Sequence, residues 1–159
     1  MCIRDRITNR KRKEGKLAEV LKDADIFIGV STGNVVTKEM VERMSENAIV
    51  FALANPVPEI MPEEAKKGGA KIVATGRSDF PNQINNLLCF PGIFRGALDA
   101  NAREINEEMK IAASNTLAEL VEEPDETTVL PSPLSKDVVK RVAESVRKAA
   151  FKSGAAKRK

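Results

Sequence analysis

Residues 25–30, DIFIGV, and residues 48–54, AIVFALA, decide the fold of this chain. Each is a short apolar run that passes directly into a polar loop, STGN at residues 31–34 and NPVPE at residues 55–59. Continuous apolar runs of this length are typical of parallel strands that are covered on both faces. We therefore expect a buried strand in each run and a loop at its carboxyl end.

The same order occurs a third time, with a strand at residues 71–74, KIVA, and a loop at residues 75–82, TGRSDFPN. Helical stretches are expected between the strands. Thr37 is a suitable N-cap, Pro62 suits the first position of a helix, and the glycines that begin at Gly68 stop that helix. Strand, loop and helix in this repeated order predict an α/β fold with a parallel sheet. Ligands of such sheets bind at the carboxyl ends of the strands.

The rest of the chain is expected to be helical. Residues 83–90 read as a helical stretch that Pro91 and Gly92 break, followed by further helices at residues 93–100, at residues 104–121 and after the N-cap Ser135. Residues 122–133, with three prolines, are expected to form a linker. We expect three parts: a ragged start or junction at 1–6, a partial domain at 7–152 and a basic tail at 153–159.

The composition excludes several kinds of chemistry. The 159 residues contain no His, Tyr or Trp, which excludes Ser-His-Asp catalysis, imidazole metal ligands and a tyrosine acid. The two cysteines, Cys2 and Cys89, are too few for a disulfide framework and indicate a reducing, cytoplasmic location. No apolar run approaches the roughly 20 residues of a membrane span, so no membrane partner is expected.

The net charge of +3 is unevenly distributed. Residues 1–16 have seven basic and two acidic side chains, and residues 136–159 have nine basic and two acidic side chains. The intervening residues have ten basic and nineteen acidic side chains. Basic ends can contact nucleic acid, but no aromatic residues are interleaved to stack on bases. We interpret the ends as a solvated helix face and a tail and expect no nucleic-acid partner.

Three asparagines are the main candidates for ligand contacts. Asn55 directly follows the second strand, and Asn85 and Asn86 are expected in the first turn of a helix. An amide orients a carboxylate or a carboxamide without adding charge, and a helix N-terminus favours an anion. The alternative is local: Asn55 starts a turn before Pro56, and the pair caps a helix.

Other polar groups carry weaker signals. The loop at residues 31–34 is small enough to approach a ligand, and Arg77 pairs with Asp79 or contacts an anion. Cys89 lies among apolar residues and is expected to be inert. The chain has no G-x-G-x-x-G sequence for a dinucleotide pyrophosphate and no acidic cluster with metal-ligand spacing. A complete dehydrogenase site cannot be assembled from these residues.

Several ordered stretches resemble the NAD(P)-binding domain of bacterial and archaeal malic enzymes. They are ADIFIGVS at residues 24–31, FALANPVPEI at 51–60, ATGRSDFPNQINN at 74–86 and FPG at 90–92. The similarity extends from about residue 7 to about residue 151. It implies the C-terminal half of a Rossmann-like sheet, with about three strands, followed by C-terminal helices.

The resemblance implies oxidative decarboxylation of malate to pyruvate and CO2 with reduction of NAD or NADP, assisted by Mg2+ or Mn2+. It assigns substrate contacts to Asn55, Asn85 and Asn86. It assigns cofactor contacts to Gly29, Val30, Ser31, Gly33, Asn55 and Asn85. The full-length family members are expected to be homo-oligomers.

The family's catalytic Tyr and Lys, its acidic metal ligands and its glycine-rich loop have no counterpart in this sequence. We therefore expect a fragment that supplies contact loops, contains no catalytic or metal-binding residue and is inactive alone. The alternative is a non-catalytic α/β binding or assembly module that pairs with a separate chain. In either case a partial sheet is expected to expose an edge strand and an apolar face.

Overall fold

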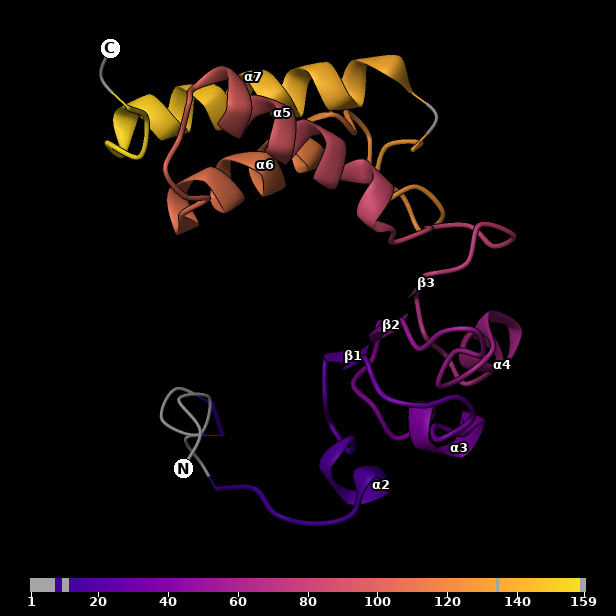
Figure 1. The fold of residues 1–159 in the computed structure, drawn as a ribbon. Helices are drawn as coiled ribbons and strands as arrows, with labels where there is room; N and C mark the ends of the chain where they lie inside the picture. Colours follow the sequence, from indigo (N-terminus) through magenta and orange to yellow (C-terminus); the bar gives the residue numbers. More distant parts are fainter. Residues whose placement is uncertain (1–7, 10–11, 134, 158–159) are drawn as a thin grey trace. The chain divides into compact units, whose positions relative to one another are not determined.

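The computed structural model describes residues 8–9, 12–133 and 135–157. The chain forms two compact units, Met1–Thr75 and Gly76–Lys159 (Figure 1). Each unit has a hydrophobic core of its own. The expected junction at residues 1–6 and the last two residues of the expected tail lie outside the described residues.

The first unit is built on a three-stranded parallel sheet. Its strands are β1 (Ile26–Gly29), β2 (Ile49–Ala52) and β3 (Ile72–Thr75), in the order β1-β2-β3. Short helices α2 (Leu17–Val20), α3 (Lys38–Val41) and α4 (Pro62–Lys67) separate or precede them. The predicted α/β fold with a parallel sheet is confirmed. The register places the last residue of β1 beside Ala52, and Ala52 beside Thr75, so the three strands end together.

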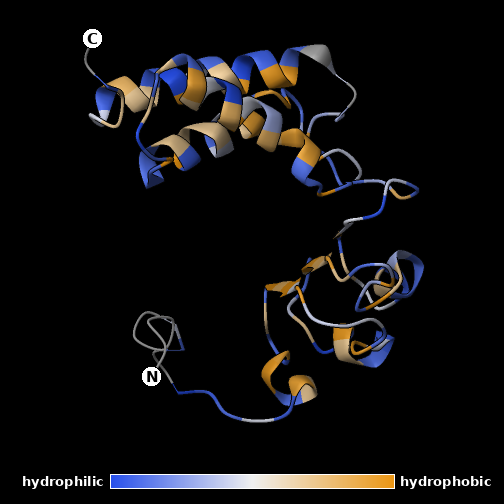
Figure 2. Ribbon diagram, viewed as in Figure 1, coloured by the Kyte–Doolittle hydropathy of each residue, from blue (hydrophilic) through white to orange (hydrophobic). Residues whose placement is uncertain are grey.

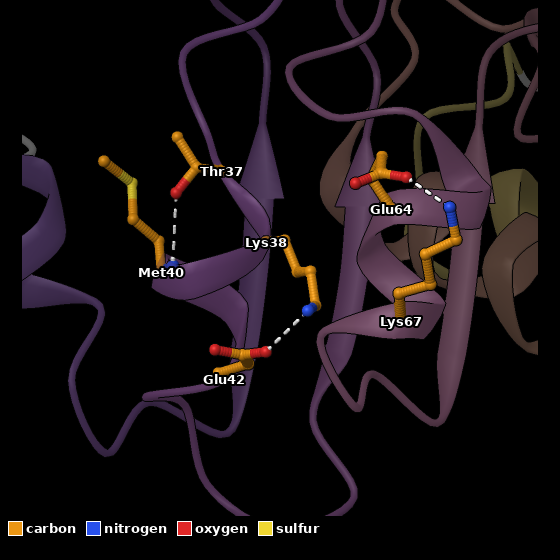
Figure 3. Close-up of polar contacts among 6 residues, drawn as sticks. All are labelled: Thr37, Lys38, Met40, Glu42, Glu64 and Lys67. Atoms are coloured by element: carbon orange, nitrogen blue, oxygen red, sulfur yellow. Dashed lines mark hydrogen bonds and ion pairs between the residues drawn. The ribbon is translucent and has the colours of Figure 1, made fainter.

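Local sequence signals set the ends of α3 and α4 (Figure 3). The Thr37 hydroxyl accepts a hydrogen bond from the Met40 N–H at 3.4 Å, as expected of an N-cap. Pro62 occupies the first turn of α4, and the left-handed backbone of Gly69, with φ of 92°, follows its end. Ion pairs span one turn of each helix, Lys38–Glu42 at 3.1 Å and Glu64–Lys67 at 2.7 Å.

The core of the first unit lies on one face of the sheet, where Val50, Ala52 and Val73 pack with residues of the three helices. The expectation that the first strand is buried on both faces is wrong. Ile26 is 54% exposed and Ile28 62% exposed, whereas Phe27, on the other face, packs against the core. Among the described strands β1 pairs only with β2, which confirms the expected edge strand with an exposed apolar face.

The second unit is helical, with the 3-10 turn η1 (Asn86–Leu88) and helices α5 (Phe90–Asp99), α6 (Glu107–Glu119) and α7 (Lys136–Lys152). The expectation of a helix at residues 83–90 that ends at Pro91 is wrong. Only η1 is helical there, and Pro91 lies in the first turn of α5, where the missing N–H of proline costs no helical hydrogen bond. Gly92 continues this helix.

Helix α7 packs against both α5 and α6, and hydrophobic residues of all three helices form the core of this unit. Hydrophobic and hydrophilic residues alternate along α5 and α7 (Figure 2). Val138, Val142 and Val146 are buried at intervals of four residues, as their spacing predicts. The Asn106 side chain caps α6 by accepting from the Met109 N–H at 3.1 Å. Ser135 occupies the N-cap position of α7, although its side chain makes no capping hydrogen bond.

Residues 154–157, at the start of the expected tail, turn back onto the second unit. Ala155 and Ala156 are buried, and Ala156 forms an antiparallel bridge with Ala102. The backbone N–H of Lys157 donates to the Asn101 carbonyl at 3.1 Å. Within the described residues no helix is both long and apolar enough to cross a membrane.

Candidate functional site

In the first unit the loops that follow β1 and β2 are joined to each other. The Asn34 N–H donates to the Pro58 carbonyl at 3.1 Å, and the Val36 N–H donates to the Glu59 carbonyl at 3.0 Å. Because β1 and β2 are parallel and in register, both loops leave the same edge of the sheet. This is the edge at which parallel α/β sheets bind ligands.

A single buried carboxylate holds these two loops. The Glu59 side chain is fully buried, and its Oε1 accepts from the Ser31 N–H at 2.7 Å and from the Ser31 hydroxyl at 3.2 Å. Its Oε2 accepts from the Ala54 N–H at 3.0 Å. One side chain therefore fixes the residue that follows Val30 in the first loop and the residue that precedes Asn55 in the second.

The pKa of Glu59 lies below the ordinary value of a glutamate. Burial alone would raise this pKa, but the hydrogen bonds from the Ser31 and Ala54 backbone N–H groups favour the ionised form and outweigh burial. Glu59 is therefore a carboxylate at neutral pH, and its charge is balanced by backbone dipoles and a hydroxyl. Its role in the fold is to fix loops.

Two glycines allow the loops to approach this closely. A Cβ atom at Gly29 would lie 2.5 Å from the Glu59 Cδ, and one at Gly33 would lie 2.8 Å from the Val57 Cβ. Both distances are far shorter than a van der Waals contact. The glycines at these positions are therefore needed for space between the loops, and the space is filled by the protein's own side chains.

The structure brings five of the predicted site residues together around Glu59, namely Gly29, Val30, Ser31, Gly33 and Asn55. Gly29 is buried at the end of β1, whereas Val30, Ser31 and Asn55 are exposed. The peptide bond between Asn55 and Pro56 is cis. The exposed members offer a hydroxyl, an amide and an apolar side chain to a ligand at this edge.

The other two predicted residues, Asn85 and Asn86, belong to the second unit. Asn85 is half-buried, and its side-chain oxygen accepts from the Leu87 N–H at 3.0 Å, which caps η1. Asn86 is exposed in η1 itself. The expectation that a helix N-terminus adds an anion-favouring dipole here is wrong, because a 3-10 turn of three residues sums too few peptide dipoles.

Asn85 nevertheless lines a pocket. An open pocket of about 610 Å3 is lined by residues from the loop before η1 and from the segment before α7. The described side chains around it are uncharged, and they include Ser78, Phe80, Asn85, Thr128, Leu130 and Ser132. The lining combines neutral hydrogen-bonding side chains with apolar ones, so a ligand in this pocket is contacted without a charged partner.

The ion-pair interpretation of Arg77 and Asp79 is confirmed. The guanidinium donates from Nε to Oδ1 at 2.9 Å and from Nη2 to Oδ2 at 2.6 Å, and it lies 5.3 Å from the centre of the Phe80 ring. The hydrogen bond from Arg77 lowers the pKa of Asp79. The guanidinium is thus engaged within its own loop.

Neither a metal site nor a reactive thiol is evident in the described part of the chain. It contains no group of three or more His, Cys, Asp or Glu residues that is placed to hold a metal ion. Burial raises the pKa of the Cys89 thiol, which makes the nucleophilic thiolate scarce at neutral pH. The inert character expected of Cys89 is supported by this direction.

The sequence predicts only a loop at Glu59 and gives this residue no role, whereas in the structure it joins the loops after β1 and β2. The available signal was a lone carboxylate between Pro58 and Ile60, where the neighbouring side chains are apolar. A charge among buried residues needs hydrogen-bond partners. For Asn82 the sequence likewise predicts only a loop, although this residue is buried and has a left-handed backbone, with φ of 55°.

A parallel sheet with helices between its strands and polar loops at the carboxyl ends of the strands is the architecture of a Rossmann-like domain. The family model described as "Malic enzyme, NAD binding domain" matches residues 3–151. The chain therefore belongs to the malic enzyme family, within its NAD-binding domain, as the sequence resemblance predicts.

Curated relatives and solved structures agree with this assignment. The bifunctional malic/malolactic enzyme of Bacillus subtilis is 56% identical over 96% of this chain. The NAD-dependent malic enzyme of Geobacillus stearothermophilus is 51% identical over 96% of the chain. The crystal structure of malic enzyme from Pyrococcus horikoshii superposes with a TM-score of 0.90 at 56% identity and covers 94% of the chain.

The chain matches only part of each of these proteins. It spans 38% of the Bacillus subtilis relative, 32% of the Geobacillus stearothermophilus relative and 35% of the Pyrococcus horikoshii chain. Relatives with NAD-dependent and NADP-dependent names both occur, since the NADP-dependent malic enzyme of Escherichia coli is 45% identical over 89% of this chain.

Proposed function

We propose that this chain supplies substrate- and cofactor-contacting loops to a malic enzyme. The reaction converts malate and NAD(P)+ to pyruvate, CO2 and NAD(P)H. The carrying observation is the buried Glu59 carboxylate, which binds the loops after β1 and β2 to each other. Loops held in one geometry before a ligand arrives lose little conformational freedom on binding.

The predicted residues take distinct roles in this proposal. Asn55 contacts malate and lies close to the nicotinamide, and Gly29, Val30, Ser31 and Gly33 border the cofactor. Asn85 and Asn86 contact malate, and Asn85 also contacts the cofactor. Uncharged amides orient a dicarboxylate while leaving the protonation of neighbouring groups unchanged. Their contribution is positioning, which lowers the barrier by fixing the reactants in a productive geometry.

The described residues suit part of the nicotinamide cofactor but not the metal ion. Ser31 and Asn55 are exposed at the strand ends and suit a nicotinamide cofactor, with the Ser31 hydroxyl as an acceptor because it donates to Glu59. No glycine-rich pyrophosphate loop occurs in the sequence. The described residues do not form a site for Mg2+ or Mn2+. In the proposal the metal ligands, the catalytic acid and base and the pyrophosphate loop come from the part of the malic enzyme length that this chain does not match.

Complementation tests the proposal. The chain is assayed for malate-dependent NAD(P)H formation alone and after co-expression with the remaining part of the Bacillus subtilis relative. We expect no turnover by the chain alone and measurable turnover by the assembled pair. Turnover by the chain alone, or a stable pair that is inactive, would contradict the proposal.

Two matched variants show whether the Asn55 amide acts in the assembled enzyme. Asn55→Ala removes an exposed amide at the strand ends, and Asn115→Ala removes an exposed amide from α6. We expect the first variant to lower kcat/KM for malate by about tenfold or more, which corresponds to about 1.4 kcal/mol. The second is expected to leave it unchanged.

The second candidate function is a non-catalytic module that pairs with a separate chain. The exposed apolar side chains of Ile26 and Ile28 on the β1 edge favour association. This function predicts a stable complex with the remaining part of the relative, measured by size-exclusion chromatography, but no malate-dependent NAD(P)H formation. The same co-expression therefore distinguishes the two functions.

A further inference from the structure

The side chain of Asn82, ahead of η1, binds the segment that connects α6 to α7. Asn82 is only 8% exposed. Its Nδ2 donates to the Glu126 carbonyl at 2.8 Å, and its Oδ1 accepts from the Val129 N–H at 3.0 Å. A single amide thus uses both its donor and its acceptor to hold two segments that are more than 40 residues apart in sequence.

Both segments are shaped for this contact. Asn82 has a left-handed backbone, with φ of 55°, a conformation that asparagine adopts more readily than most residues. On the other side, the Asp125 carboxylate accepts from the Thr127 N–H at 2.7 Å and from the Thr127 hydroxyl at 2.9 Å. The connecting segment therefore has a defined turn directly beside the carbonyl and the N–H that Asn82 binds.

Both segments line the 610 Å3 pocket described above, and the residues that each segment contributes are called one wall here. Phe80, Gln83 and Asn85 lie on the wall that contains Asn82, and Thr128, Leu130 and Ser132 lie on the other. The three prolines of residues 122–133 predict a linker, whereas in the structure the last part of this range lines the pocket. The Asn82 amide bridges the two walls.

We propose that Asn82 is a positioning residue for the malate site and that residues 128–133 form one wall of that site. This inference rests on the proposed function, because Asn85 is one of the residues assigned to malate. Asn82 acts through its two backbone partners: it keeps the wall of residues 128–133 at a fixed distance from Asn85. Loss of this contact enlarges the pocket and weakens substrate binding more than it slows the chemical step.

Three variants separate the effect of the Asn82 side chain from the effect of its left-handed backbone. Asn82→Gly removes both hydrogen bonds while retaining a residue that adopts positive φ without strain. Asn82→Asp keeps the acceptor for the Val129 N–H but loses the donor to the Glu126 carbonyl. Asn101→Gly is the control, because Asn101 belongs to the same unit, has a left-handed backbone with φ of 47° and is exposed away from the pocket.

The first readout uses the chain as it is. Amide hydrogen exchange of Val129, measured by NMR, is expected to accelerate about tenfold in Asn82→Gly, the factor that corresponds to about 1.4 kcal/mol. The Asn101→Gly control is expected to match the wild type. Unchanged protection of Val129 in Asn82→Gly overturns the proposal. This measurement needs no enzyme activity. It therefore tests the contact of Asn82 with residues 126–129 even where complementation fails.

The second readout uses the assembled enzyme with malate and NAD(P)+. We expect Asn82→Gly to raise KM for malate about tenfold with kcat within about twofold of wild type. Asn82→Asp is expected to raise KM at least as much, because its carboxylate faces the Glu126 carbonyl oxygen. Faster Val129 exchange with an unchanged KM overturns the assignment of residues 128–133 to the malate site. Absence of activity with the wild-type chain instead contradicts the proposed function.

Discussion

The Glu59 carboxylate accepts a 2.7 Å hydrogen bond from the Ser31 backbone N–H across 28 residues of sequence. Its second oxygen accepts from the Ala54 N–H. The ends of β1 and β2 are therefore joined through a charge that has no access to water. An ionised group in this position is stable only while its hydrogen bonds are intact, so the loops and the carboxylate depend on each other.

Glu59→Gln tests this dependence. The substituted amide retains one acceptor but turns an NH2 group toward a backbone N–H, which leaves a buried donor without a partner. We expect a loss of about 1–3 kcal/mol in the free energy of unfolding of the first unit, measured by urea denaturation. Hydrogen exchange of the Ser31 and Ala54 amides should accelerate in parallel.

Glu63→Gln is the control for that variant, because Glu63 is exposed in the first turn of α4. Its effect should remain within about 0.5 kcal/mol, as for most surface substitutions. Equal stability of the two variants would show that the Glu59 charge contributes nothing to the loops.

The lowered pKa of Glu59 gives stability a defined pH dependence. A group whose folded-state pKa is depressed stabilises the fold fully above its unfolded pKa, about 4.3 for glutamate. This contribution is lost as pH falls through the lower folded-state value. The difference in unfolding free energy between wild type and Glu59→Gln should therefore be constant above about pH 5 and should shrink below about pH 4. A difference that grows on acidification would reverse the assigned direction of the shift.

Local patterns in the sequence predict much of this fold. The apolar runs predict all three strands, and Thr37 and Pro62 predict where α3 and α4 begin. These signals succeed because they act over a few neighbouring residues. Pro91 misleads for the same reason, since a local rule cannot tell a helix break from a helix start.

The long-range contacts that organise the candidate site could not be predicted in this way. The carboxylate of Glu59 and the amide of Asn82 bind backbone groups. Such groups are present at almost every position, so the sequence does not indicate which of them will be bound. Their partners lie up to 28 residues away for Glu59 and up to 47 for Asn82. The exposure of Ile26 likewise depends on what covers the sheet and not on the strand's own residues.

Gly29→Ala tests the space that Glu59 occupies. The added Cβ would lie 2.5 Å from the Glu59 Cδ, and the carboxylate is anchored on both oxygens and cannot swing away. We expect a destabilisation of about 1–3 kcal/mol by overpacking, measured by thermal unfolding. In the double variant with Glu59→Asp the shorter side chain should relieve part of the clash. Strict additivity of the two changes would show that the residues do not compete for this space.

Cys89 should react slowly with thiol reagents. Burial raises the pKa of its thiol, so the thiolate fraction at neutral pH is smaller than that of an exposed cysteine. A Cys2→Ser background leaves Cys89 as the only thiol, and maleimide labelling is followed by mass spectrometry. We expect labelling of the folded chain to be at least about tenfold slower than labelling in denaturant. Equal rates would mean that the thiol is accessible and ordinary.

Gly96→Ala tests the close approach of α5 and α7. Gly96 is buried, and a Cβ there would overlap the Ala143 carbonyl oxygen and lie 2.8 Å from the Val146 Cβ. Alanine improves helix propensity by about 1 kcal/mol, but a contact with backbone is relieved only by moving one helix. We therefore expect a net loss of about 1–3 kcal/mol in the stability of the second unit, measured by hydrogen exchange of Val142 and Val146. Ser114→Ala, at an exposed position of α6, improves propensity without overlap and should leave this exchange unchanged or slower. Stabilisation by Gly96→Ala would show that propensity, and not the α5–α7 contact, controls this position.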